Sequence, residues 1–339
     1  MIDEYIKQII QKKLLPGVVI SAQQDSRHLI TKSYGHFKGQ DLQLHAITEN
    51  TLFDLASLTK VVATLPATLY LLSRNELQLD RSVSEIIPAF RFPKVTIRHL
   101  LQHRSGLPAG LVPKVERHHN RDIMSEILAC NLVYNPGRFV AYSDLGMILL
   151  GKIVEKVTGE LLDQFVKRHF FNPWNMHNTQ FLLPDNQKYK VASTELVKGQ
   201  YVQGDVHDEK ALLLGGVSGS AGLFSSAKDL LLFSEYWLGI RQQSVIPFNW
   251  MESAYMNTFL GRGLGFEVLT GEEPSVSFGK KVSVGAFGHT GFTGTSICMD
   301  PVKKSSIILL TNAVHFGRNN SIREIRRQIH DLVYEELLN

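Results

Sequence analysis

The 339-residue chain lacks the features that mark disulfide-rich, zinc-binding, nucleic-acid-binding or membrane-spanning proteins. Its two cysteines, Cys130 and Cys298, lie far apart and outside any C-x-x-C spacing, which excludes a disulfide framework and a cysteine zinc site. The 36 basic and 32 acidic residues give a net charge of +4 without a block of one sign, so we expect no nucleic-acid partner. The most apolar stretch, residues 61–72, is too short to span a bilayer, so we expect no membrane segment.

The N-terminus also lacks the basic and apolar segments of a signal peptide, since Asp3 and Glu4 come first, and the expected compartment is the cytoplasm. What remains is an ordinary globular composition, with 44% hydrophobic and 20% charged residues. The length allows about two domains. The sequence leaves the oligomeric state open.

The two ends of the chain carry matching patterns. Apolar residues at helical spacing predict a helix in residues 2–10, and β-branched runs at 17–23 and 28–34 predict a hairpin. Near the C-terminus, 295–299 and 305–310 are strand-like, and a helix opens at Ser321 with Glu324 placed for a capping box. The middle of the chain has helical periodicity. We therefore predict an α/β (α+β) fold: an antiparallel sheet from both termini flanked by helices (1–50 plus 215–339), with an inserted, mostly helical domain (51–214).

Ser57 and Lys60 form an S-x-x-K arrangement at the start of an apolar helical run that contains Pro66. Residues three apart share a helix face, so a buried lysine with a neutral amine can take the serine proton and activate the hydroxyl. Free backbone N–H groups in the first helical turn favour negative charge on a substrate. Considered alone, the motif is also compatible with a capping serine and a solvated lysine. Pro66 should bend the helix or interrupt its hydrogen bonding.

Two further segments narrow the interpretation. Tyr142, Ser143 and Asp144 open a second helix, and the run 288–294 (GHTGFTG) precedes the strand at 295. In this order and at these distances, the three motifs resemble the penicillin-recognising serine hydrolases, in particular the class C β-lactamase, DD-peptidase and esterase branch. The resemblance covers most of the chain and includes segments 53–60, 96–108, 220–230 and 263–266.

The resemblance implies a cleft between a sheet domain and a helical domain, with no metal or organic cofactor. Ser57 would be the acylated nucleophile, and Lys60 and Tyr142 would share the general-base and general-acid work. The backbone N–H groups of Ser57 and Phe292 would form the oxyanion hole. Substrate would lie along an edge strand formed by Thr290, Gly291 and Phe292.

Two departures from the family pattern concern the substrate. Asp144 stands where the second motif commonly has Asn, so it can only accept hydrogen bonds and can pair with Lys60, which raises the lysine pKa and shifts the proton transfer toward Tyr142. His289 stands where the third motif often has Lys, and a neutral histidine attracts a substrate carboxylate less strongly. We therefore predict a hydrolase of a small ester, amide or cell-wall-derived peptide with weak β-lactam turnover.

Alternatives remain. One is a true β-lactamase or DD-peptidase, and another is a catalytically idle member that binds peptides or acts as a scaffold. The segment 207–222 resembles members associated with cell-wall peptide recycling, many of which have His where this chain has Ser220. His99 and His103 could share a metal, but a structural role is favoured because no H-E-x-x-H pattern accompanies them. Arg326 and Arg327 are predicted to lie on a solvated helix face.

Overall fold

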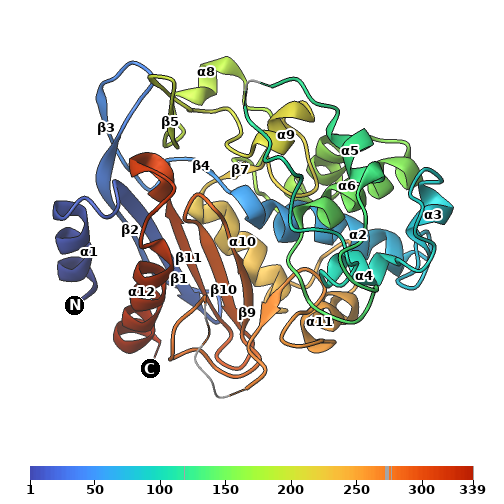
Figure 1. Ribbon diagram of the computed structural model, residues 1–339. Helices are drawn as coiled ribbons and strands as arrows, with labels where there is room; N and C mark the ends of the chain where they lie inside the picture. The colour runs from blue at the N-terminus through green and yellow to red at the C-terminus, as the bar shows by residue number, and fades with distance from the viewer. Residues whose placement is uncertain (118, 272–274, 276, 339) are drawn as a thin grey trace.

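A seven-stranded antiparallel sheet organises one side of the molecule (Figure 1). The computed structural model describes residues 1–117, 119–271, 275 and 277–338. The strands run in the order β3-β2-β1-β11-β10-β9-β8, so β1 pairs with β11 and the two ends of the chain share one sheet. Their bounds are β1 Gly17–Gln24, β2 Arg27–Lys38, β3 Leu44–Ala46, β8 Glu267–Val268, β9 Phe287–Thr290, β10 Ser296–Asp300 and β11 Ser305–Thr311.

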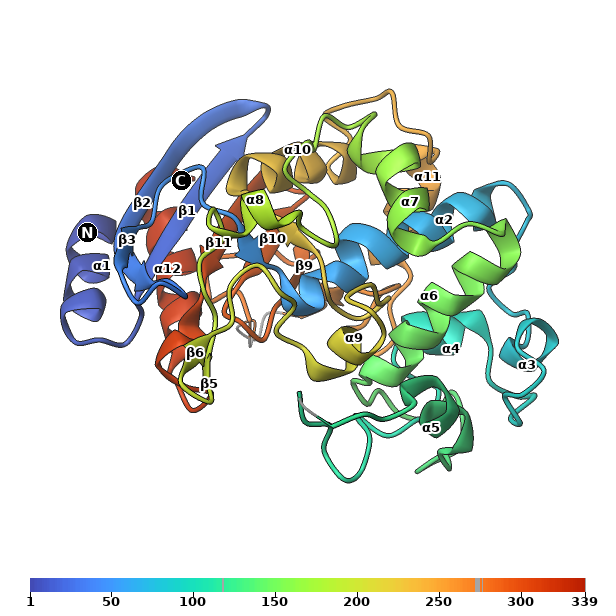
Figure 2. The same cartoon turned by 90° about the horizontal axis from the view of Figure 1, so that it is seen from above.

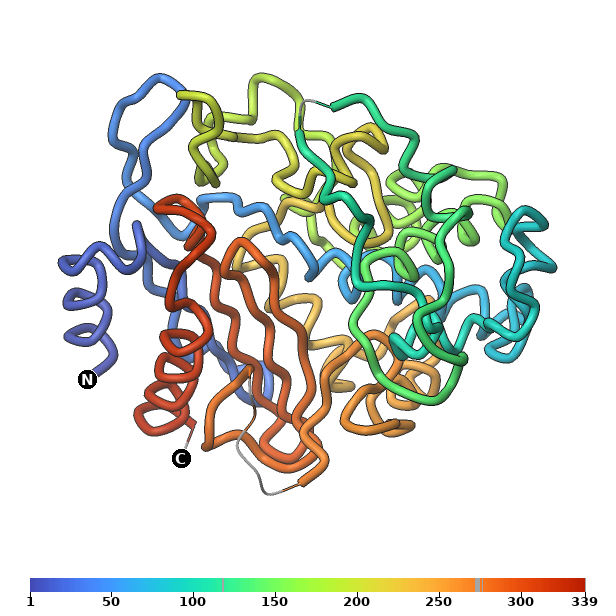
Figure 3. The backbone as a smooth tube through the Cα atoms, in the orientation of Figure 1, coloured from blue at the N-terminus to red at the C-terminus, as the bar shows by residue number. Residues whose placement is uncertain are grey.

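Helices cover both faces of this sheet. Terminal helices α1 (Ile2–Gln11) and α12 (Ile322–Leu337) lie on one face and α10 (Ala227–Trp237) on the other (Figure 1). Both faces need a cover because successive residues of β11 place apolar side chains on opposite faces. Ile307 packs with the terminal helices, while Ile308 packs with the core that contains α10. The central strands are therefore buried on both faces, and their continuous apolar runs reflect this. The two ends of the chain lie on the same side of the molecule (Figure 3).

The remaining helices gather beside the sheet in two perpendicular views (Figures 1 and 2). The α-helices are α2 Leu65–Ser73, α3 Val83–Ile86, α4 Ile97–Leu101, α5 Ile123–Ala129, α6 Asp144–Thr158, α7 Leu162–Val166, α8 Asp185–Lys188, α9 Glu209–Leu213 and α11 Phe248–Met256. Short ladders join β4 (Phe53–Asp54) to β7 (Phe224–Ser225) and β5 (Leu196–Val197) to β6 (Gln200–Tyr201). Short 3₁₀ or π segments complete the list, at Ala56–Leu58, Lys60–Thr64, Lys167–Phe171 and Ala313–Phe316.

The predicted fold class and the hairpins at both ends of the chain are confirmed. The predicted capping box at the last helix is wrong. The Ser321 side chain makes no capping hydrogen bond, because Asn320 Oδ1 accepts from the Ile322 N–H (3.2 Å) instead. Glu324, freed from that role, pairs with Arg327.

The helical run Ala56–Ser73 is longer than the apolar stretch seen in the sequence. Among the described residues it is the one helix long and apolar enough to cross a membrane, but 83% of it is buried inside the protein, as in a core helix. Its regularity breaks as Pro66 predicts. A π segment, Lys60–Thr64, precedes α2, and Pro66 occupies the first turn of α2, where its missing N–H costs little.

Candidate active site

Ser57 follows a tight turn at the end of β4. Ala56 adopts a left-handed conformation (φ +45°), which is unusual for a residue with a side chain. The buried carboxylate of Asp54 holds this turn, because Oδ1 accepts from the Ala56 N–H (2.7 Å) and Oδ2 accepts from the His207 N–H (2.7 Å). Ser57 then lies in the 3₁₀ turn Ala56–Leu58. Sequence reasoning missed Asp54, although it lies between an apolar strand and the nucleophile.

Lys60 Nζ contacts Ser57 Oγ directly. The distance is 2.8 Å, and the ammonium also donates to the Ser220 carbonyl (2.9 Å). Lys60 is fully buried, so the solvated alternative is excluded. The loop that contains Ser220 therefore contributes a backbone acceptor to the site.

Asp144 pairs with Lys60, as its position in the sequence suggested. Oδ1 lies 2.9 Å from Lys60 Nζ, and Oδ2 lies 3.3 Å from the ammonium of Lys210, which the sequence analysis missed. Burial raises the pKa of Asp144, but Lys60 and Lys210 outweigh burial and lower it to about 2. Burial lowers the pKa of Lys60, but the Asp144 carboxylate, together with the neighbouring Tyr142, outweighs burial and raises it above the ordinary lysine value.

Tyr142 lies against two buried imidazoles. Its ring centroid is 4.5 Å from that of His103 and 5.9 Å from that of His289, and Lys60 Nζ lies 5.1 Å from the tyrosine ring centre. About a third of the Tyr142 side chain is exposed, so the phenol can reach a substrate. The structure therefore brings Ser57, Lys60 and Tyr142 together.

Both imidazoles are neutral. Burial, followed by the charges of Arg262 and Lys60, lowers the pKa of each well below the usual histidine value. His289 Nδ1 donates to the Thr290 carbonyl (2.8 Å), which leaves Nε2 without a proton and without a partner among the described residues. His103 Nδ1 accepts from the Ser143 N–H (3.2 Å).

The end of β9 borders the nucleophile, with one difference from the predicted edge strand. The strand ends at Thr290, and its neighbour β8 pairs only with Phe287 and Gly288, so His289 and Thr290 leave one edge open. Gly291 and Phe292 lie in the following turn, where the Gly291 N–H donates to the Thr295 carbonyl (2.7 Å). Within the described chain, neither the Ser57 nor the Phe292 backbone N–H donates a hydrogen bond.

A cleft of about 890 Å³ contains Ser57, Tyr142 and the residues 289–292. Four arginines line it with Glu267: Arg262, Arg318, Arg323 and Arg326. The prediction of a solvated Arg326 is wrong, because this side chain is 5% exposed and donates to the Gly294 carbonyl (3.2 Å). The cleft therefore has more positive than negative side chains in its lining even though His289 is neutral.

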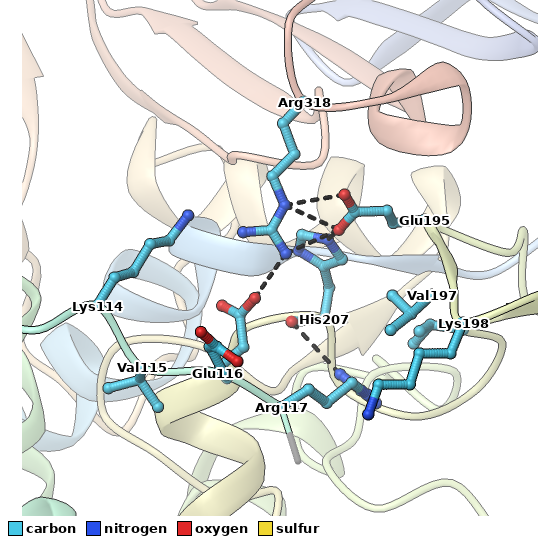
Figure 4. A pocket seen from close by; sticks show the side chains of 11 residues that line it. Lys114, Val115, Glu116, Arg117, Glu195, Val197, Lys198, His207 and Arg318 are labelled. Carbon is cyan, nitrogen blue, oxygen red and sulfur yellow. Dashed lines mark hydrogen bonds and ion pairs between the residues drawn. The ribbon is translucent and has the colours of Figure 1, made fainter. Parts of the chain in front are cut away.

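A second pocket of about 290 Å³ adjoins the cleft (Figure 4). Arg318 lines both, and within the pocket it pairs with Glu195 and Glu209 at 2.7 and 2.5 Å. His207 lies 3.0 Å from Glu195 and stacks on Phe292, with ring centres 5.8 Å apart. The ion pairs of Glu195 thereby fix His207, and the stacked His207 ring packs against Phe292.

No three His, Cys, Asp or Glu side chains gather in the described part of the chain in a way that could hold a metal ion. His99 has a structural role, since its Nδ1 accepts from the Thr96 N–H in a capping box that begins α4.

Comparison with known proteins identifies the family of this chain. The Beta-lactamase family matches residues 2–331. The chain is 31% identical to the N-acetylmuramyl-L-alanine amidase of Bacillus subtilis (strain 168), over 91% of this chain and 80% of that protein. It is 32% identical to the Escherichia coli (strain K12) protein named "Putative D-alanyl-D-alanine carboxypeptidase", over 92% and 82%. EstCE1, a hydrolase with promiscuous acyltransferase activity, shares the fold with a TM-score of 0.79 at 21% identity, over 98% and 97% of the two chains. The chain belongs to the β-lactamase family of serine hydrolases.

Proposed function

We propose that the protein hydrolyses a small ester, amide or cell-wall-derived peptide through an acyl-enzyme formed on Ser57, with weak β-lactam turnover. One observation carries the proposal: Ser57 Oγ lies 2.8 Å from the ammonium of a fully buried lysine, inside the large cleft. A serine next to a buried lysine, whose deprotonated amine can take the serine proton, is an arrangement that supports nucleophilic catalysis.

In this proposal Ser57 Oγ attacks the substrate carbonyl carbon and gives its proton to the base formed by Lys60 and Tyr142. The developing oxyanion accepts from the Ser57 and Phe292 N–H groups, which is typically worth about 3 kcal/mol per donor. The proton then passes to the leaving group as its bond to the carbonyl carbon breaks. Water attacks the acyl-enzyme and restores Ser57. The Lys60–Asp144 ion pair supports a large share for Tyr142 in these transfers.

The substitutions at two motif positions support weak β-lactam turnover. Asp144 cannot donate to a substrate amide carbonyl, and neutral His289 does not attract a carboxylate as a lysine would. The similarity to an amidase supports amides as a substrate class.

A D-Ala-D-Ala carboxypeptidase activity is the second candidate. The arginines in the cleft favour it, because a free C-terminal carboxylate could bind Arg262 or Arg326 in place of the missing motif lysine. The similarity to the Escherichia coli relative points to the same activity.

Parallel labelling with a fluorophosphonate and a fluorescent penicillin tests the proposal. We expect a fluorophosphonate adduct on Ser57 in the wild type, none in Ser57→Ala, and weak penicillin labelling. Hydrolysis of a p-nitrophenyl ester, nitrocefin and a D-Ala-D-Ala peptide then ranks the substrate classes. Nitrocefin turnover at the rate of a dedicated β-lactamase would contradict the substrate assignment. Equal inactivity of both proteins, without any adduct, would instead favour an idle binding protein.

A further inference from the structure

A row of four side chains with alternating charge leads away from the nucleophile. Lys60 Nζ lies 2.9 Å from Asp144 Oδ1, Lys210 Nζ lies 3.3 Å from Asp144 Oδ2, and Lys210 Nζ lies 2.8 Å from Asp208 Oδ2. The side chains of Asp144, Lys210 and Asp208 are at most 22% exposed, so water screens these charges weakly. The π segment, α6, and α9 with its N-cap Asp208 bring the four groups together.

The two ammonium groups compete for one carboxylate. A lone anion beside Lys60 would favour its charged form and keep it from accepting the Ser57 proton. Lys210 binds the other oxygen of that anion and repels the charge on Lys60. Asp208 opposes Lys210 in turn, and it is fixed in place because its Oδ1 accepts from the Ala211 N–H (2.8 Å).

We propose that Lys210 is a positioning residue of the reaction: it holds the outer oxygen of Asp144 and offsets the carboxylate charge, so that Lys60 can accept the proton of Ser57. This inference rests on the proposed acyl-enzyme function. The reacting form is the fraction of enzyme in which Lys60 is a neutral amine. In acylation the Ser57 oxygen bonds to the carbonyl carbon as its proton moves to that amine. The bond between the carbonyl carbon and the leaving group then breaks, and the leaving group takes the proton from Lys60.

The other groups around Lys60 do not supply this balance. Tyr142, His103 and His289 face it from the remaining sides, and both imidazoles are uncharged. Arg262 adds positive charge near both histidines. Lys210 and Asp208 are thus the charged residues of this row that can be substituted while Lys60 and Asp144 are kept.

Two substitutions with opposite expected effects test the proposal. The acidic limb of the kcat/KM profile for a p-nitrophenyl ester reports the base of the free enzyme. Lys210→Met leaves Asp144 and Asp208 facing Lys60, so we expect this limb to move to higher pH, by on the order of one pH unit. Asp208→Asn removes the carboxylate that offsets the Lys210 charge. Lys210 then disfavours the charged form of Lys60 more strongly, so the limb should move to lower pH. Lys228→Met, at an exposed position on α10, is the matched control and should leave the profile unchanged.

The pH dependence of Ser57 labelling by a fluorophosphonate provides the same comparison without turnover. Limbs that move in the same direction in both variants, or in neither, overturn the role of Lys210. Such a result leaves the proposed function intact as long as wild-type labelling depends on Ser57. Absence of ester hydrolysis and of any Ser57 adduct in the wild type would overturn both.

Discussion

The groups around Ser57 form two sets, which we call the charged wall (Lys60, Asp144 and Lys210) and the neutral wall (His103 and His289). On one side, Lys60, Asp144 and Lys210 are buried as charged groups, and each has an oppositely charged partner within 3.3 Å. On the other side, His103 and His289 are buried without such partners and lose their charge. Lys60, His103 and His289 are all nearly fully buried, so the counter-ions decide which of them stays charged. The protein thereby holds charged and neutral groups within one cleft.

Removal of Lys60 takes away the end of the charged row that contacts Ser57, and we expect this to be the largest effect. Lys60→Met should lower kcat/KM for a p-nitrophenyl ester by on the order of 10³-fold, because it removes the proposed base, whose Nζ lies 2.8 Å from Ser57 Oγ. Asp144 keeps Lys210 as its partner, so the variant should remain folded by circular dichroism. Activity within tenfold of wild type would show that Tyr142 alone suffices as the base.

The next prediction concerns the turn after β9, which contains Gly291 and Phe292. A Cβ atom on Gly291 would lie 2.1 Å from Thr295 Oγ1 and 2.5 Å from the Leu55 carbonyl oxygen, so the turn must shift. Gly291→Ala should displace the Phe292 N–H and lower kcat on the order of 10²-fold, as expected for loss of an oxyanion donor. Gly110→Ala is the matched control, since a Cβ there meets nothing within 4 Å. Similar kcat values for the two variants would contradict the role of the Phe292 N–H as an oxyanion donor.

Much of this arrangement could be predicted from short-range patterns. Strands β1, β2, β10 and β11, the terminal helices and the pair Ser57 and Lys60 are identified by spacing within one element or motif. Asp144 is identified through the family resemblance. Lys210 could not be identified in this way, because its contact with Asp144 exists only after α9 folds onto α6. Arg326 did carry a signal: it lies four residues after Ile322 and three before Ile329, on the apolar stripe of α12, which marks it as buried.

Asp144→Asn tests the charged wall through stability. The carboxyl has a pKa of about 2 in the folded protein and an ordinary value when unfolded, so its contribution is present above about pH 4 and is lost as the pH falls toward 2. Between pH 5 and pH 2 the wild type should lose about 2 kcal/mol of unfolding free energy more than the variant. Urea unfolding at both pH values measures this difference. Equal losses would mean that the ion pairs do not stabilise the folded state.

The neutral wall should lose stability in a different pH range, which separates it from the charged wall. Folded His289 does not bind a proton where the unfolded imidazole does, so stability falls as the pH drops below about 6.5. Each such histidine contributes a slope of about 1.4 kcal/mol per pH unit below that value. His289→Asn should therefore flatten the unfolding free energy between pH 6 and pH 4.5, a range in which Asp144 stays ionised and adds nothing. An unchanged slope would mean that His289 binds a proton in the folded protein, and the two walls would then differ in composition but not in charge.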